Sequence, residues 1–294
     1  MTETLYLIYD GDSYQVHELS TRHVTALGGI AMPPVRHVVQ RGPRQQGDTL
    51  LDVLLEPRVV TVGILEKQAT RGAWWSARRD LLNMLKRFDD LKLRLVIDDT
   101  SESFDLPVAY EAGAENLDAF GISDYRAVLR LRAHDPVWRA TSTSTLVVGV
   151  AALGDAGILP WTFPITLGVS FINANIPLVY GGTWRAYPQI DIRGPITNPT
   201  ITNNATSETL KIETTIDDGD TVRVDLAAGV KTVENITDDA NWMQYLSDDS
   251  DLATWHLAAD PEADGGINAL YFHGLAGGAN TAITLRWQNR FIGV

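Results

Sequence analysis

Short runs in which apolar and polar residues alternate, each ending at a turn sequence, are the feature of this chain that most restricts its fold. The first two runs, Leu5–Tyr9 and Tyr14–Leu19, flank Asp10-Gly11-Asp12, and this arrangement predicts a β-hairpin. Further β-rich runs follow at 35–39, 49–55, 58–65, 91–97 and 125–133. Because alternation places every second side chain on one face of a strand, the first half is predicted to form β-sheets.

The run Tyr125–Ala133 predicts a half-buried strand with a basic outer face. Small and apolar residues at every second position would point inward, and three arginines, Arg126, Arg130 and Arg132, would point outward with Val128. The strand therefore offers a charged surface to solvent or to a partner.

One segment, Trp74–Asp90, has helical spacing instead. At about 100° per residue, its apolar side chains fall on one face. They are Trp74, Ala77, Leu81, Met84, Leu85 and Phe88. Arg78 lies inside this apolar stripe, and two interpretations are open: its charged end reaches solvent near the helix start, or it forms an ion pair with another subunit.

The composition divides the chain into three parts. Residues 1–140 are predicted to be the first β domain, and residues 141–186 a connector in which Asp155 is the only charged residue before Arg185. We expect the connector to pack against other parts of the protein, because a free linker of this length would be more polar.

A second β domain is predicted from Tyr187 to Val294. Thr209–Ile216 and Thr221–Leu226 flank Asp217–Asp220, which indicates a hairpin. Two further strands are expected at 267–273 and 282–287. Short strands separated by turns are typical of a β-sandwich, so the whole chain is predicted to be mainly β with one substantial helix.

The charge of the chain argues against nucleic-acid binding. The formal net charge is −13, and the residues after 140 hold 7 Lys and Arg against 17 Asp and Glu. Phosphate contacts require clustered basic residues. The longest apolar run, Leu146–Leu153, is far shorter than the roughly 20 residues of a spanning helix, so no membrane insertion is expected.

No motif for catalysis, cofactor binding or metal binding is recognisable. The chain has no cysteine, and its six histidines follow no metal-ligand spacing. The acidic turns at 217–220 and 248–251 lack the spacing of a calcium loop. We therefore expect no catalytic residue, no cofactor and no metal site.

The sequence from Tyr187 onward resembles the C-terminal domain of bacteriophage distal tail proteins. The matching segments are Tyr187–Gly194, Ile196–Asn203, Gly219–Asp225, Asp249-Ser250-Asp251, Gly266-Ile267-Asn268 and Ile283–Trp287. An acidic insert, Ala259–Asp264, stands where the family has a plain Pro-Gly turn. The first half, which ends in Asp135-Pro136-Val137-Trp138, resembles the family more loosely.

This resemblance implies a structural protein of the virion tail tip, assembled in the host cytoplasm. It implies a split β-barrel-like N-terminal domain that forms a homohexameric ring, and a galectin-like C-terminal β-sandwich. The expected neighbours are the major tail tube protein, the tail-associated hub protein and other baseplate or fibre proteins. DNA would pass through the lumen without specific binding, past acidic groups such as Asp98, Asp99, Glu102 and Asp105.

The side chains predicted for the subunit interface lie on the helix and on the basic strand. They are Trp74, Trp75, Arg78, Arg130 and Arg132. A second function is open: a carbohydrate-binding module that contacts host glycans through aromatic stacking. Its candidate residues are Trp242, Tyr245, Trp255, Tyr271 and Trp287, which could equally pack in a core.

Overall fold

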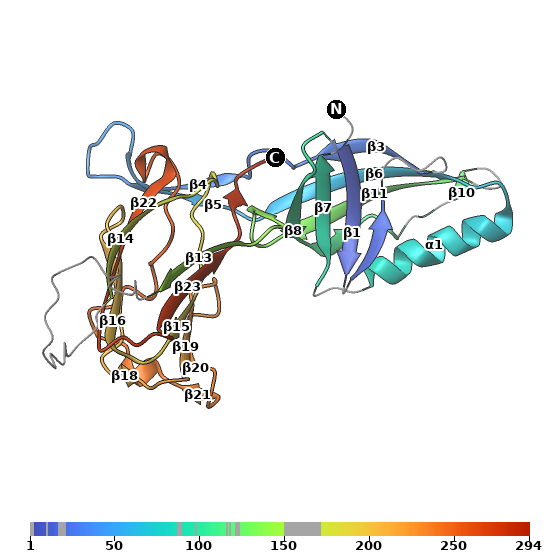
Figure 1. Ribbon diagram of the computed structural model, residues 1–294. Helices are drawn as coiled ribbons and strands as arrows, with labels where there is room; N and C mark the ends of the chain where they lie inside the picture. The colour runs from blue at the N-terminus through green and yellow to red at the C-terminus, as the bar shows by residue number, and fades with distance from the viewer. Residues whose placement is uncertain are drawn as a thin grey trace, which may run out of the picture. The chain divides into compact units, whose positions relative to one another are not determined.

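The computed structural model describes residues 3–9, 11–16, 22–86, 90–97, 99–115, 117, 119–120, 124–149 and 172–294. The chain divides into two compact units (Figure 1). The first comprises Met1–Thr141 with Arg290–Val294, and the second comprises Ser142–Asn289. The last five residues therefore join the first unit, whereas the sequence placed them in the C-terminal domain.

The first unit contains a six-stranded antiparallel sheet. Its strands in spatial order are β2 (Asp12–Gln15), β1 (Glu3–Tyr9), β7 (Lys92–Ile97), β8 (Glu102–Pro107), β12 (Trp138–Ala140) and β24 (Arg290–Phe291). β1 and β2 form the hairpin that the sequence predicts. β24 contributes the C-terminal edge, where Phe291 packs edge-to-face on Phe104 at 5.2 Å between ring centroids.

The second sheet of this unit is built around two ten-residue strands. Its main order is β10 (Ala119–Phe120), β11 (Asp124–Ala133), β6 (Arg58–Lys67) and β3 (Arg22–Gly28), and β9 (Ala109–Ala112) also pairs with β11. β6 is hydrogen-bonded on both sides, by β11 and β3. Its stretch Thr61–Glu66 is therefore paired on both edges inside the subunit.

Helix α1 (Arg71–Leu85) begins three residues before the predicted start and ends five residues before the predicted end. The Thr70 hydroxyl accepts a hydrogen bond from the Ala73 N–H at 3.2 Å, which caps the N-terminus. Trp74, Leu81 and Leu85 are buried in the core that both sheets share, as the helical spacing predicts. Phe88 lies outside the described residues.

A buried polar group lies within this core. Glu66 is fully buried and accepts hydrogen bonds from Arg22 and Gln68. Arg22 also lies over the ring of Tyr14, 4.0 Å from its centroid. Tyr125 is fully buried nearby, and burial raises the pKa of its hydroxyl to about 12, with the charge of Glu66 adding to the effect.

This pKa predicts a loss of stability in alkali. The unfolded tyrosine ionises near pH 10 and the folded one near 12, so the stabilisation is complete below pH 10 and disappears as the pH rises to about 12. The expected loss is about 2 kcal/mol across that window. Denaturant unfolding from pH 9 to 12 should show a shallower decline for Tyr125→Phe, and Tyr245→Phe, an exposed tyrosine, should behave as the parent protein. Equal slopes for all three proteins would contradict the prediction.

The second unit is a two-layer β-sandwich. One sheet has the order β13 (Ser144–Gly149), β23 (Ala282–Trp287), β15 (Gln189–Arg193), β19 (Thr221–Asp225), β20 (Thr232–Asn235) and β21 (Ala240–Asn241). The other has β14 (Ile172–Val179), β22 (Ile267–Leu275), β16 (Ile196–Asn203) and β17 (Glu208–Lys211), with β18 (Thr215–Ile216) paired to β16. Two short 3₁₀ helices, η1 (Met243–Tyr245) and η2 (Asp264–Gly266), complete it. Residues such as Ile190 and Phe272 from the two sheets share one core.

The hairpin predicted around Asp217–Asp220 is wrong in its pairing. β18 pairs with β16 and β19 pairs with β15, so the two flanking strands lie in different sheets. A turn does form, since the Asp220 N–H donates to the Asp217 carbonyl at 3.1 Å. The turn passes the chain from one layer of the sandwich to the other.

The predicted connector is part of the sandwich where it is described. β13 pairs with β23 and β14 pairs with β22, one in each sheet. The remainder of the connector, residues 150–171, lies outside the described residues. The expectation that this segment packs rather than runs free therefore holds for its two strands.

Candidate assembly surface

A two-stranded hairpin of the first unit pairs with no other described strand. It consists of β4 (Val35–Gln40) and β5 (Thr49–Leu55). In Figure 1 it runs as a separate ribbon beyond the sheets of its unit. Every residue of β4 except Val38, and every residue of β5 except Leu55, is exposed.

The register of the hairpin gathers apolar side chains on one face. Val35 lies opposite Leu55, and Val39 lies opposite Leu50, with a bulge beside the latter pair. Cross-strand partners point to the same face, so these residues lie together with Val53. The exposed members and the neighbouring Leu51 have exposed fractions between 38% and 58%. Such a concentration of solvent-exposed branched aliphatic residues marks an interaction surface.

The predicted interface residues of the helix separate into core and surface. Trp74 is only 2% exposed and contacts Tyr125 edge-to-face at 6.2 Å, so within the subunit it fills the core, and its place in an interface stays a prediction. Trp75 is 44% exposed. The guanidinium of Arg78 lies 5.3 Å from the Trp75 ring centroid, which fits the interpretation of a side chain that reaches the surface over aromatic rings.

The predicted basic face of β11 is present on the surface. Arg130 and Arg132 are exposed, and both approach Glu111, at 3.3 and 3.5 Å. Exposed pairs of this kind contribute less than about 1 kcal/mol, so both arginines remain available to a partner. Their role in an interface stays a prediction.

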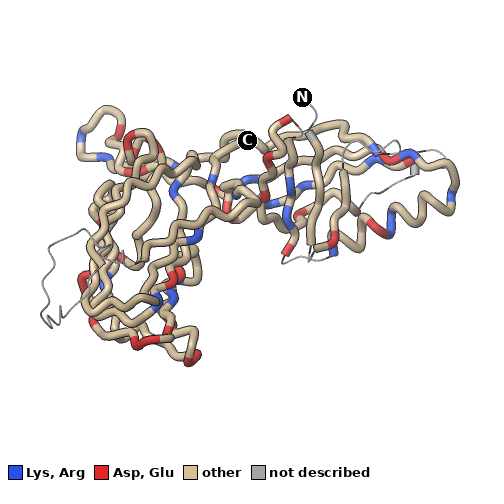
Figure 2. Tube along the Cα trace, viewed as in Figure 1, with Lys and Arg blue, Asp and Glu red and all other residues tan. Residues whose placement is uncertain are grey.

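Two of the acidic residues expected along a lumen, Asp105 and Asp98, give that expectation no support. Asp105 accepts two hydrogen bonds from Arg94, at 2.6 and 2.8 Å, and its charge is thereby compensated. Asp98 lies outside the described residues. The negative charge of this strand is therefore partly balanced by Arg94. Figure 2 shows basic and acidic residues interspersed along the first unit.

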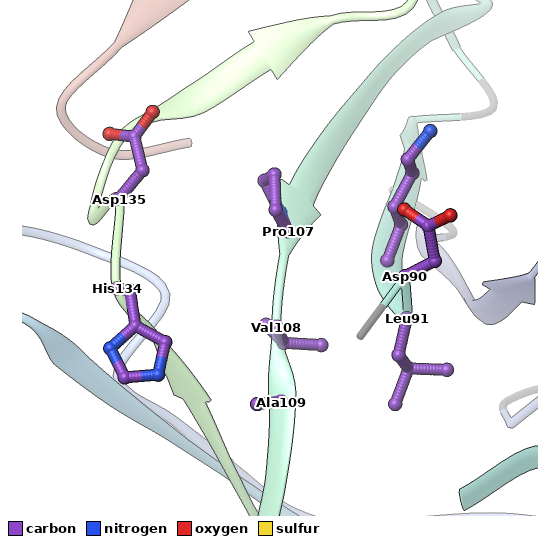
Figure 3. A pocket seen from close by; sticks show the side chains of 8 residues that line it. Asp90, Leu91, Pro107, Val108, Ala109, His134 and Asp135 are labelled. Carbon is purple, nitrogen blue, oxygen red and sulfur yellow. The ribbon is translucent and has the colours of Figure 1, made fainter. Parts of the chain in front are cut away.

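A cavity of about 570 Å³ in the first unit has several titratable groups in its lining (Figure 3). His134 and Asp135 lie on one side and Asp90 on the other, with Val108 between them. Asp135 is already bound by two arginines: Arg290 donates at 2.7 Å and Arg139 at 2.8 Å. Asp135 therefore anchors strands β12 and β24 rather than serving as a free acid.

The histidines and acidic turns form no metal cluster within the described residues. His256 is buried, with its Nδ1 2.8 Å from the Thr254 carbonyl and its Nε2 3.1 Å from Glu262. It therefore fastens the acidic insert 259–264 to the sandwich. No described helix has the length and hydropathy needed to cross a membrane.

The aromatic residues considered for glycan binding are mostly structural. Trp255 is fully buried, and Trp287 is nearly so. Trp242 packs against the same core and meets the exposed Tyr245 at 5.0 Å, with ring planes 65° apart. This pair forms no flat stacking platform, and glycan binding stays a prediction.

The described residues form two mainly-β units, and one unit carries an apolar hairpin that pairs with no other described strand. Residues 181–291 match the family described as siphovirus-type tail component, C-terminal domain. Residues 181–291 are thereby assigned to a phage tail component domain, and this match supports a protein of the distal tail type. The resemblance found in the sequence from Tyr187 onward is thereby confirmed.

Two solved structures share the fold over nearly the whole chain. The crystal structure of the phage SPP1 Dit protein, described as a paradigm of the hub adsorption apparatus in phages that infect Gram-positive bacteria, superposes with a TM-score of 0.62 at 14% identity. That alignment covers 98% of this chain and 99% of the other. A chain of the phage P2 baseplate, in its activated conformation with Ca, matches with a TM-score of 0.52 at 8% identity, covering 100% of both. No curated protein sequence matches this chain.

Proposed function

We propose that this protein is a structural ring subunit of the tail tip, in which six copies join the tail tube to the hub or baseplate around a channel for DNA. Its role would be scaffolding rather than catalysis. The observation that carries this proposal is the β4–β5 hairpin, because an isolated two-stranded hairpin is at best marginally stable in water. Covering its apolar face with another subunit would stabilise it.

A closed ring is the natural outcome of such an interface. When one patch of a subunit binds a different patch of the next copy, the contact repeats and closes if the rotation per subunit permits. The fold shared with the SPP1 Dit protein, which is described as part of a hub, and with a baseplate chain supports this assignment. The neighbours above and below the ring would be the tail tube and the tail-associated hub protein.

Removing the apolar character of the hairpin is expected to abolish assembly while the subunit stays folded. The triple variant Leu50→Thr, Leu51→Thr and Val53→Thr keeps β-forming residues but removes the exposed aliphatic surface. Mass photometry and native mass spectrometry should show hexamers of the parent protein and monomers of the variant, with matching circular dichroism spectra.

The matched control carries threonine at three exposed valines outside the hairpin, Val147, Val179 and Val230. Their exposed fractions of 50% to 68% are similar to the 40% to 58% of the replaced hairpin residues, so the control removes a similar apolar area. It should assemble as the parent does. A parent protein that stays monomeric, both alone and when added to tails that lack this subunit, would overturn the proposed function.

A further inference from the structure

A shallow apolar groove lies beside helix α1 in the first unit. Its volume is about 460 Å³. Leu82, Leu85 and Lys86 line it from the helix, and Tyr110, Ala114 and Glu115 line it from the segment that begins in β9. Leu82 is exposed although it is a large aliphatic residue, so the groove has an apolar wall that no described residue covers completely.

The exposed side of α1 continues this groove as a basic and apolar stripe. Trp75, Arg79, Leu82 and Lys86 follow one another at spacings of four, three and four residues, which places them along one side of the helix. All four are exposed, and the stripe is about 16 Å long. Arg71 extends it, and Asp80 is the one acidic residue of the helix.

The β5 edge of the hairpin has the complementary character. Asp48 lies directly before β5 and Asp52 lies within it, and no basic residue lies between them in the sequence, whereas Glu56 after the strand is paired with Arg36. Leu50 and Leu51 lie between the first two acids and are more than half exposed. Asp48 and Asp52 are separated by about 13 Å along the strand, which is close to the length of the helix stripe.

We propose that the β5 edge of one copy lies along α1 of the next copy, with the leucines of the hairpin at the Leu82 groove. This inference rests on the proposed ring and identifies the surface that receives the hairpin. It pairs acidic with basic groups and apolar with apolar side chains. It also supplies two different patches on one chain, as a cyclic interface between identical subunits requires.

Disulfide trapping tests this contact cleanly because the chain has no cysteine of its own. In Leu51→Cys/Leu82→Cys, oxidation of the assembled protein is expected to yield a covalent ladder up to the full ring on a non-reducing gel. Each single variant can form at most a dimer. The matched control is Leu51→Cys/Val128→Cys, whose second site is more exposed than Leu82 but lies on the outer face of β11.

The two proposals fail in different ways. A ring of normal mass that gives no ladder with Leu82→Cys, or a ladder with Val128→Cys instead, would overturn the groove assignment and leave the ring intact. A parent protein without any ring would overturn both. A ladder confined to Leu51→Cys/Leu82→Cys supports the inference.

Charge reversal provides a second, independent readout. The pair Arg79→Glu/Lys86→Glu on the helix, or Asp48→Lys/Asp52→Lys on the hairpin, is expected to raise the concentration needed for assembly at least about fivefold. Combining all four reversals should restore most of the loss, which a general destabilisation would not do. Additive losses in the combined variant would contradict the inference.

Discussion

Replacing Arg58 by methionine is expected to unfold the first unit more readily than any surface change, with a loss on the order of 4 kcal/mol. The guanidinium is buried, and burial lowers its pKa to about 10. It donates to the carbonyls of Ile30 at 2.9 Å and Ala31 at 2.8 Å, and also to that of Ile292. Methionine would fill the space and leave these acceptors without a donor.

The substitution is expected to affect both the segment after β3 and the C-terminus, because Arg58 donates hydrogen bonds to both. Gly29, at φ +83°, lies so close that a Cβ there would be 2.3 Å from the Val59 carbonyl oxygen. The Trp138 indole N–H also donates to the Ile30 carbonyl, at 3.0 Å. Losing the guanidinium should therefore loosen β24 as well as the segment that leads into the hairpin.

Thermal unfolding followed by circular dichroism is the measurement for Arg58→Met. The expected decrease in Tm is about 10 °C for a unit of this size. Arg36→Met is the matched control, since Arg36 is exposed and pairs with the partly exposed Glu56 at 3.0 Å. Hydrogen exchange should show faster exchange at β12 and β24 in Arg58→Met, while the sandwich stays protected. An unchanged Tm for Arg58→Met would refute this account of the residue.

The second large effect is expected from Asn268→Leu in the sandwich. The Asn268 side chain is fully buried, and all of its polar groups are engaged. Its amide donates to the carbonyls of Ala258 at 2.9 Å and Gly266 at 3.1 Å. Its oxygen accepts from the Ala258 N–H and from Asn203, both at 2.8 Å.

Leucine has a similar volume but can satisfy none of these four groups. The Gly266 carbonyl keeps the Tyr180 N–H and the Asn203 amide keeps the His256 carbonyl, whereas the N–H and the carbonyl of Ala258 lose their Asn268 partners. This loss inside one connected network is expected to cost on the order of 4 kcal/mol. Hydrogen exchange at Ala258 and denaturant unfolding should both report the loss. Asn175→Leu, at an exposed position of β14, should change stability by less than about 0.5 kcal/mol. Equal effects of the two substitutions would argue against the network.

The candidate assembly surface could be predicted only in part from the sequence. The runs at 35–39 and 49–55 are recognisable as strands, but an apolar run ordinarily predicts burial, and nothing local indicates that this hairpin lacks a covering layer. Trp74 and Trp75 are adjacent in the sequence, and the helical period alone places both near the apolar face. The packing of α1 buries the first against Tyr125 and leaves the second exposed.

The sequence by itself indicated many of the strands, the one α-helix and the family that the C-terminal half resembles, but it did not single out β3, β8 or β12. These properties depend on local periodicity and on short motifs, so neighbouring residues suffice to encode them. Only the tertiary structure decided which strands pair. The two-residue alternation along a strand assigns each side chain to a face of the sheet but does not determine which strand pairs with it. For this reason the separation of β18 from β19, the return of β24 to the first unit and the uncovered face of β4 and β5 emerged only from the fold.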